Sequence, residues 1–239
     1  MSSPFFQFKQ FSVSQDGCAM RINTDGVILG ALAGEGLQPE TVLDIGTGTG
    51  VIALMLAQRF PLAIVDALEI DRIAAQTAEF NFSESVFSKR LRVYPESFQD
   101  FAIHHPDKQY DLIVTNPPFF VNSLKNPNKQ KETARHADHS FFEELASFVR
   151  QKLTQDGVLA VVLPLETASL FARYASLSYL HLIGETYIHS YSESEPHRII
   201  QLFSLKKVKQ KTSSFVIYSS IKQYSEDFVN SLKDFFIIF

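Results

Sequence analysis

The chain has 239 residues, 45% of them hydrophobic and 20% charged, so it can bury one sizeable core as an ordinary globular protein does. Its 22 basic and 26 acidic residues give a formal net charge of −4, which excludes a global positive field that would attract a polyanion. The single cysteine, Cys18, excludes an internal disulfide and a cysteine-cluster metal site.

The sequence shows neither a secretion leader nor a run of 18 apolar residues, so we expect a soluble, cytoplasmic protein without membrane contact. A lone cysteine fits that reducing compartment. His136 and His139 lie three residues apart, but a metal site needs further ligands, so we expect no metal. Tryptophan is absent and there are 22 phenylalanines, so phenylalanine must supply most of the aromatic core and any stacking surface.

Residues 1–38 precede the first predicted sheet strand and are expected to form an N-terminal cap. Four phenylalanines surround Lys9 and suggest an apolar lid with one charge, and these are Phe5, Phe6, Phe8 and Phe11. Further along, an apolar stretch from Val27 to Ala33 predicts a helix. Thr24 or Asp25 could cap that helix, because both residue types accept hydrogen bonds from the first helical N–H groups.

The strongest signal is a glycine-spaced turn between two apolar segments. Thr41 to Ile45 predicts a buried strand, and Val51 to Phe60 predicts a helix. The turn between them contains Gly46, Gly48 and Gly50. Glycine adopts positive φ readily and lets a ligand approach the backbone. The helix behind the turn offers unpaired N–H groups and a partial positive charge to an anionic group.

An acidic residue follows the next predicted strand. The apolar run Ile64–Leu68 ends at Glu69, which lies about twenty residues beyond the glycine turn, as in nucleoside-binding folds. A carboxylate in this place can accept two hydrogen bonds from a ribose diol. Strand, glycine turn, helix, strand and acid therefore predict a nucleoside-binding half-fold. The alternative is that the glycines only form a tight turn.

The rest of the chain alternates predicted helices and strands. Helices are predicted over Arg72–Phe82, Phe141–Leu153 and Glu166–Leu177, and strands over Leu91–Tyr94, Tyr110–Thr115 and Val158–Leu163. Val121–His139 is predicted to be a polar loop. Two late strands, Leu182–His189 and Ile199–Leu205, have no helix-length segment between them, so we expect an antiparallel pair. A basic linker, Lys206–Lys211, leads to a phenylalanine-rich terminal helix. This order predicts an α/β fold.

A proline-rich tetrapeptide, Asn116-Pro117-Pro118-Phe119, directly follows the strand Tyr110–Thr115. The carboxyl ends of parallel strands meet at one sheet edge, so we expect it beside the glycine turn. The Asn116 side-chain oxygen and the Pro117 carbonyl could each accept one N–H of a planar amine and stabilise charge that develops on its nitrogen. Phe119 offers a face for a flipped-out base. The alternative is that the prolines only end the strand and that Phe119 is a core residue.

The segment Asp44–Gly50 resembles the first motif of the Rossmann-like S-adenosylmethionine-dependent methyltransferases, and Glu69 falls on their second. The tetrapeptide resembles the motif of those that methylate planar nitrogens. The resemblance implies an α/β class I fold over residues 39–239, with a seven-stranded, mostly parallel sheet and helices on both faces. It also implies S-adenosyl-L-methionine as the cofactor. The implied cofactor-binding residues are Thr24, Asp25, Asp44, Gly46, Thr47, Gly48, Gly50, Glu69, Ile70, Ser97 and Asn116.

Several further blocks resemble one group along almost the whole chain, the bacterial tRNA1(Val) adenine-37 N6-methyltransferases. The blocks are Phe8-Lys9-Gln10-Phe11, Asn23-Thr24-Asp25-Gly26, Leu43-Asp44-Ile45-Gly46, Leu54-Met55-Leu56-Ala57-Gln58-Arg59, the tetrapeptide and Pro196-His197-Arg198. This resemblance implies methylation of an adenine in tRNA, with Asn116, Pro117 and Phe119 as catalytic residues. One departure concerns the cofactor adenine: the family pattern has an aspartate where this chain has Ser97, which hydrogen-bonds more weakly.

The loop beyond the tetrapeptide supplies the expected RNA contacts. The candidate substrate-binding residues are Phe119, Phe120, Lys125, Lys129, Lys131 and Arg135. Such charge runs are often only solvated surface, but this loop leaves from the expected substrate edge, so contact with tRNA phosphates is the hypothesis. We expect tRNA as the partner and a monomer. The alternatives are a glutamine N5-methyltransferase of release factors, a ribosomal-RNA guanine enzyme, and a non-catalytic cofactor- or RNA-binding module.

Overall fold

A computed structural model describes residues 5–117 and 129–239, with side chains described from residue 139 onward in the second range. The sheet strands are β3 (Thr41–Ile45), β4 (Ile64–Leu68), β5 (Leu91–Tyr94), β6 (Tyr110–Thr115), β7 (Leu153–Leu163), β8 (His181–His189), β9 (Pro196–Ser204) and β10 (Lys211–Val216). Two hairpins lie outside this sheet, β1 (Phe5–Gln7) with β2 (Ser12–Ser14), and β11 (Tyr218–Ser220) with β12 (Gln223–Tyr224). The helices are α1 (Thr24–Leu32), α2 (Val51–Arg59), α3 (Arg72–Ser83), α4 (Phe98–His104), α5 (Lys129–Lys152), α6 (Leu165–Leu177) and α7 (Glu226–Leu232), with a 3₁₀ turn at Ser88–Arg90.

The described residues form one large sheet of eight strands in the order β10-β8-β9-β7-β6-β3-β4-β5. Strand β9 pairs antiparallel with both β7 and β8, while the other neighbouring pairs are parallel, so β9 alone is reversed. The expected antiparallel pair of late strands is therefore confirmed. The expected number of seven strands is wrong by one, because β10 adds to the edge of the sheet alongside β8.

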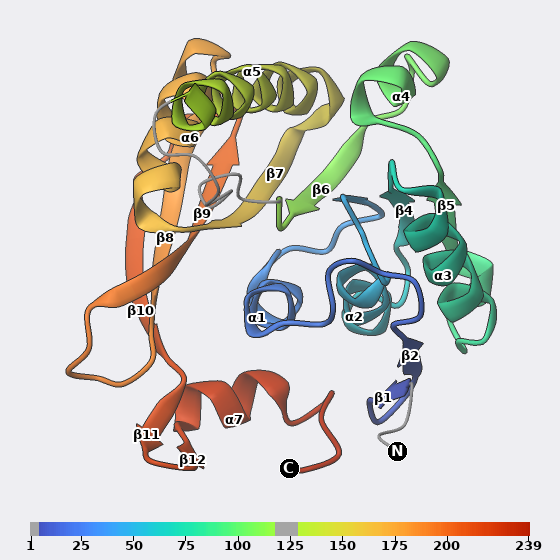
Figure 1. The fold of residues 1–239 in the computed structure, drawn as a ribbon, viewed down its shortest axis with the longest axis vertical. Coiled ribbons are helices and arrows are strands. Elements are labelled where there is room, and N and C mark those ends of the chain that lie inside the picture. Colours follow the sequence, from blue (N-terminus) through green and yellow to red (C-terminus); the bar gives the residue numbers. More distant parts are fainter. Residues whose placement is uncertain (1–4, 118–128) are drawn as a thin grey trace.

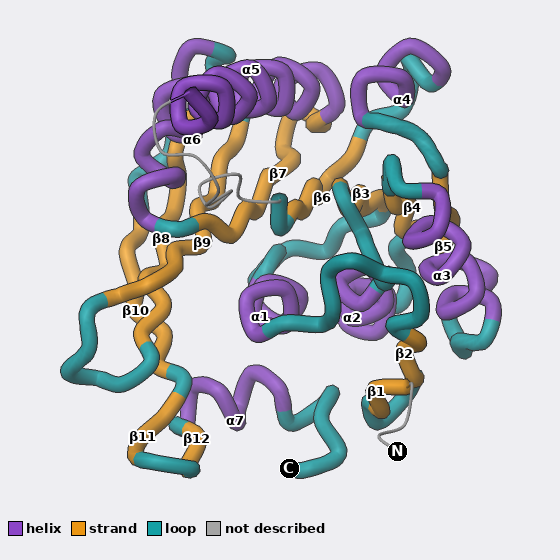
Figure 2. Tube along the Cα trace, viewed as in Figure 1, coloured by secondary structure: helices purple, strands orange, loops and turns teal. Residues whose placement is uncertain are grey.

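Helices cover both faces of this sheet, as expected (Figure 1). Figure 2 shows α4, α5 and α6 together on one face and α1, α2 and α7 on the other. Successive residues of a buried strand point to opposite faces, so Val42 packs in one apolar cluster and Leu43 in the other. Both clusters are closed to water, which explains why the parallel strands are continuous apolar runs.

The predicted boundaries fail around α5. This helix begins at Lys129, so the second half of the predicted polar loop is helical. Its first half carries no apolar stripe, and hydrophobic periodicity gave no signal there, although lysine, glutamate, alanine and arginine are good helix formers. The helix ends at Lys152, and β7 begins immediately at Leu153 rather than at Val158.

Of the four N-terminal phenylalanines, Phe5 and Phe6 are exposed, whereas Phe8 and Phe11 belong to the core rather than to a lid. Phe8 and Phe11 are buried in the same apolar cluster as α1 and α2, and their rings stack with centroids 4.5 Å apart. Phe8 also forms an isolated antiparallel bridge with Phe236, so the two ends of the chain lie together. The Lys9 ammonium donates to the Lys233 carbonyl at 2.6 Å, which joins the N-terminal hairpin to the end of α7.

Candidate active site

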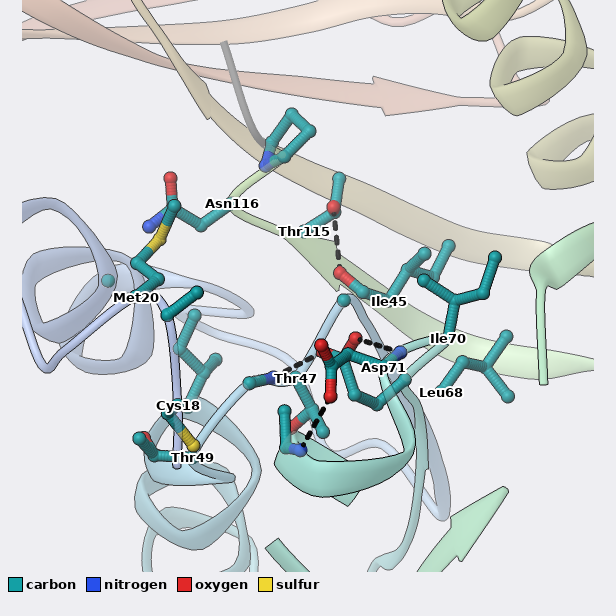
Figure 3. Close-up of a pocket in the computed structure, with 18 of the residues that line it drawn as sticks. Cys18, Met20, Ile45, Thr47, Thr49, Leu68, Ile70, Asp71, Thr115 and Asn116 are labelled. Atoms are coloured by element: carbon teal, nitrogen blue, oxygen red, sulfur yellow. Dashed lines mark hydrogen bonds between the residues drawn. The ribbon is translucent and has the colours of Figure 1, made fainter. Parts of the chain in front are cut away.

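The carboxyl ends of β3, β4 and β6 open into one cavity of about 420 Å³ (Figure 3). Its wall contains the glycine turn after β3, Glu69 and Ile70 after β4, and Asn116 and Pro117 after β6. A segment that precedes α1, from Cys18 to Asn23, completes the wall. The sequence motifs that were expected to meet at one sheet edge therefore line a single cavity.

The three glycines of the turn have positive φ, at 72° for Gly46, 55° for Gly48 and 82° for Gly50. A Cβ added to Gly46 or Gly48 would meet nothing within 4 Å, so these positions face open space that a ligand can fill. A Cβ on Gly50 would lie 2.5 Å from the Phe82 ring. Two glycines therefore keep the backbone accessible to a ligand, and the third allows α3 to pack against the turn.

The Glu69 carboxylate lies against the glycine turn. Its Oε2 accepts a hydrogen bond from the Gly48 amide at 2.8 Å, and its Oε1 accepts one from the Asp71 amide at 2.9 Å. Each carboxylate oxygen can accept more than one hydrogen bond. Glu69 is thus held in place by the backbone and keeps capacity for a ribose diol.

Asp44 lies beneath the turn rather than on the cavity wall. Its side chain is fully buried, and its Oδ2 accepts a hydrogen bond from the Thr47 hydroxyl at 2.6 Å. Burial raises the pKa of Asp44 from 3.8 to about 7, although the Thr47 hydrogen bond acts in the opposite direction. The structure therefore makes Asp44 a support of the turn that exchanges a proton near neutral pH.

The end of β6 holds Asn116 at the opposite side of the cavity from Ile70 (Figure 3). The Thr115 hydroxyl donates to the Ile45 carbonyl at 2.9 Å and fastens the end of β6 to that of β3. The Asn116 amide nitrogen donates to Asn23 Oδ1 at 3.4 Å. Asn116 and the adjacent Pro117 therefore line the same cavity as the glycine turn, with the Asn116 amide nitrogen bonded to Asn23.

The remaining predicted cofactor residues differ in placement. Ile70 is exposed on the cavity wall, where it offers an apolar face. Ser97 also lines the cavity, but its hydroxyl caps α4 by accepting from the Asp100 amide at 3.0 Å and donating to the Asp100 carboxylate at 2.8 Å. Its capacity for a contact with the cofactor adenine is correspondingly reduced.

Thr24 and Asp25 do not line this cavity, and neither is the cap of α1. The N-cap is Asn23, whose Oδ1 accepts from the Gly26 amide at 2.8 Å. Thr24 lines a second cavity of about 380 Å³ between β1, α1 and α7. Asp25 pairs with Arg198, with Nε and Oδ2 2.7 Å apart, so the Pro196–Arg198 block meets the N-terminal block here.

Sequence reasoning missed the segment Cys18–Asn23 as part of the cavity wall. Asn23 carries a usable signal, because asparagine is a preferred N-cap residue and lies a few residues before the apolar stretch that predicts the helix. Met20, which is 47% exposed, carries none, since neither its type nor its spacing marks a site.

The predicted RNA-binding residues lie mostly beyond what the structure describes. Phe119, Phe120 and Lys125 are outside the described residues. Lys129, Lys131 and Arg135 belong to the first part of α5, for which only the backbone is described. Within the described residues there is no cluster of three potential metal ligands, and no helix has the length and apolarity needed to cross a bilayer.

The cavity fits the cofactor that the sequence motifs imply. Gly46 and Gly48 leave a cradle that a side chain would fill, and Glu69 stands beside it with hydrogen-bonding capacity for a ribose. The Cys18–Asn23 segment lines the cavity together with Asn116. A nucleoside joined to a methyl-bearing group can thus lie between Glu69 and Asn116.

Fold and cavity together define a Rossmann-like S-adenosylmethionine-dependent methyltransferase. Residues 27–168 match the family model of the methyltransferase small domain. A tRNA1(Val) (adenine(37)-N6)-methyltransferase from Pedobacter heparinus is 48% identical over 236 residues, which are 98% of each chain. Proteins of the same name from Bacteroides fragilis and Flavobacterium psychrophilum are 38% and 39% identical, over 99% and 97% of this chain and 99% of each relative. The chain belongs to the tRNA1(Val) (adenine(37)-N6)-methyltransferase family.

Solved structures support the fold assignment. A predicted O-methyltransferase from Agrobacterium tumefaciens superposes with a TM-score of 0.70 at 15% identity, covering 88% of this chain and 96% of its own. A ribosomal protein L11 methylase from Lactobacillus delbrueckii superposes with a TM-score of 0.53 at 18% identity, covering 76% and 78%. At such identities the likeness concerns the fold alone.

Proposed function

We propose that this chain transfers a methyl group from S-adenosylmethionine to the N6 amine of adenine 37, beside the anticodon of tRNA1(Val). The names of its full-length relatives support this substrate. The observation that carries the chemistry is that Asn116 and Pro117 line the same cavity as the glycine turn. That arrangement brings an amine-binding group next to the place where a nucleoside cofactor fits.

The proposed mechanism depends on how the amine is held. An exocyclic adenine amine is a poor nucleophile, because its lone pair is delocalised into the ring. Asn116 Oδ1 and the Pro117 carbonyl each accept one N–H and thereby aim the lone pair. S-adenosylmethionine would supply an electrophilic methyl group from its sulfonium, which would leave as a neutral thioether, and the methylated amine would give up one N–H proton to water. The same two acceptors stabilise the positive charge that develops on nitrogen in the transition state. Such positioning can lower a barrier by as much as about 7–11 kcal/mol in favourable cases.

The proposed cofactor contacts come from residues of the glycine turn and of the cavity wall. Glu69, which is held by the Gly48 amide, would accept hydrogen bonds from the ribose, and Gly46 to Gly50 would leave room for the cofactor. Asp44 supports this glycine turn through its hydrogen bond with Thr47. Ile70, which is exposed on the cavity wall, would cover the adenine, and Ser97, which is bonded to Asp100, would hold its amine only weakly. Asn116 would then lie at the methyl-bearing end.

The proposed partner is tRNA, bound by a monomeric, cytoplasmic enzyme. Phe119 is proposed to stack on the flipped adenine, and Phe120 together with four basic residues to contact the RNA. These basic residues are Lys125, Lys129, Lys131 and Arg135. A local basic patch is needed because the whole chain has a net charge of −4.

The experiment that tests this function uses methyl-labelled cofactor with three separate acceptor pools: tRNA, ribosomal RNA and release factors. After digestion of the RNA to nucleosides, we expect label in N6-methyladenosine from tRNA alone. Label in the release factor would instead identify a protein glutamine methyltransferase, and label in guanosine a ribosomal-RNA enzyme. A tRNA carrying guanosine at position 37 serves as the matched negative substrate.

The role of Asn116 has its own prediction. Asn116→Ala should lower kcat about 100-fold or more, because it removes one of two acceptors for the charge that develops on nitrogen. Cofactor affinity, measured by calorimetry, should stay nearly unchanged. A variant that keeps the wild-type kcat would exclude the assigned role.

A further inference from the structure

Asn23 joins the start of α1 to the end of β6 through one oxygen atom. Asn23 Oδ1 accepts a hydrogen bond from the Gly26 amide at 2.8 Å and a second from Asn116 Nδ2 at 3.4 Å. Both asparagines line the cavity that holds the glycine turn. The contact spans 93 residues of sequence, so it links two segments that are far apart in the chain.

The first of these hydrogen bonds fixes the direction of the second. A backbone amide can only donate, so the atom of Asn23 that caps α1 must be the carbonyl oxygen and not the amide nitrogen. The Asn116 atom that approaches this oxygen must therefore be the donor, its NH₂ group. Because the two polar atoms of a carboxamide are on opposite sides of its carbon, Asn116 Oδ1 is turned away from Asn23.

We infer that Asn23 is a positioning residue that orients the Asn116 carboxamide, so that its oxygen and not its nitrogen faces the amine to be methylated. This inference rests on the proposed function, because it assigns Asn23 a role only through the Asn116 acceptor. Without Asn23, the carboxamide of Asn116 can rotate by half a turn and present N–H donors to a substrate group that itself donates.

The surroundings support this role. The Thr115 hydroxyl bonded to the Ile45 carbonyl fixes the backbone next to Asn116, and Asn23 fixes the other end of its side chain. A Cβ built on Gly26 would lie 3.5 Å from Asn116 Nδ2, so α1 approaches the carboxamide closely at this point. The side chain is thus held at both ends, as an acceptor must be if it is to match one transition-state geometry.

The test separates the capping role of Asn23 from its role at Asn116. Asn23→Ser keeps a preferred N-cap residue but is too short to reach Asn116, whereas Asn23→Asp keeps both a cap and an acceptor of the same shape. We expect Asn23→Ser to lower kcat about tenfold or more, in line with loss of one productive hydrogen bond, with cofactor affinity and Tm nearly unchanged. Asn23→Asp should keep kcat within about threefold of wild type.

A double variant completes the experiment. If Asn23 acts through Asn116, then Asn23→Ser should not lower the kcat of Asn116→Ala any further. Independent, multiplicative losses would overturn the inference, and so would a wild-type kcat for Asn23→Ser when Asn116→Ala is impaired. If Asn116→Ala itself is fully active, the proposed function fails and the inference fails with it. A loss of Tm that is equal in the serine and aspartate variants, with equal loss of kcat, would reduce Asn23 to a structural cap and also overturn it.

Discussion

Two carboxylates, Glu69 and Asp44, support the glycine turn from different sides. Glu69 accepts hydrogen bonds from the Gly48 and Asp71 amides, so the residue proposed to bind the ribose also sets the shape of the turn. Asp44 is fully buried and receives the Thr47 hydroxyl, so it supports the same turn from the other side. Each side chain therefore gives a separate measurable effect.

Glu69→Ala should weaken S-adenosylmethionine binding by roughly 10- to 100-fold, the range expected for lost hydrogen bonds to a charged group. At saturating cofactor, kcat should change little, because the proposed reaction takes place at Asn116 and not at Glu69. Calorimetric titration gives the affinity. Glu79→Ala, an exposed glutamate on α3 away from the cavity, is the matched control. Equal affinities of the two variants would contradict the assignment.

The raised pKa of Asp44 predicts how stability depends on pH. Its pKa is about 7 in the folded chain and about 3.8 when unfolded, so the unfolded chain loses this proton first as the pH rises. The free energy of unfolding should therefore fall between about pH 4 and pH 7 on account of this group. Asp44→Asn can still accept from Thr47 but does not titrate. Thermal unfolding without cofactor should show that the Tm of Asp44→Asn rises relative to the wild-type Tm between about pH 4 and pH 7. A difference in Tm that does not change with pH would refute the effect.

At the scale of elements, the junction of β3 and α2 depends on one close contact with α3. Gly50→Ala would combine an unfavourable φ of 82° with a Cβ 2.5 Å from Phe82. We expect a loss of about 1–2 kcal/mol from the backbone and about 1–3 kcal/mol more from overpacking. Gly36→Ala, with φ 78° but no atom within 4 Å of the added Cβ, should show the first loss only. Chemical denaturation measures both, and equal losses would exclude the packing contribution.

The elements that sequence could predict are those with a local signal. Glycine spacing, apolar runs and the acid after β4 located β3, α2, β4 and β6 closely, and residues in and directly after these strands line the cavity. The polar half of α5 has no apolar stripe, and β10 is a largely exposed edge strand, so neither produces a periodic pattern. The cavity wall at Cys18–Asn23 depends on tertiary packing, and the ion pair of Asp25 with Arg198 joins residues 173 apart.

At the scale of the molecule, a buried asparagine ties the N-terminal segment to the site. Asn81 on α3 accepts from the Ser14 amide and donates to the Ser14 and Thr49 carbonyls, at 2.8 to 2.9 Å. Asn81→Ala would leave these groups buried without partners, at about 1–3 kcal/mol each. We expect a loss of about 3 kcal/mol or more in the free energy of unfolding, together with faster proteolysis within residues 1–38. Asn81→Asp should lose only the two donated bonds.

The single reversed strand decides which parts of the chain can reach the ligand edge. The other strands of the large sheet have their carboxyl ends at the edge where the cavity lies. Strand β9 instead has its amino end at this edge, beside the carboxyl end of β7. Arg198, near the start of β9, therefore lies next to Asp25 in the first turn of α1. The N-cap residue of the same helix, Asn23, accepts the hydrogen bond from Asn116. If β9 were parallel to its neighbours, Arg198 would lie at the opposite edge of the sheet. The Asp25 carboxylate would then need a positively charged partner from another part of the chain.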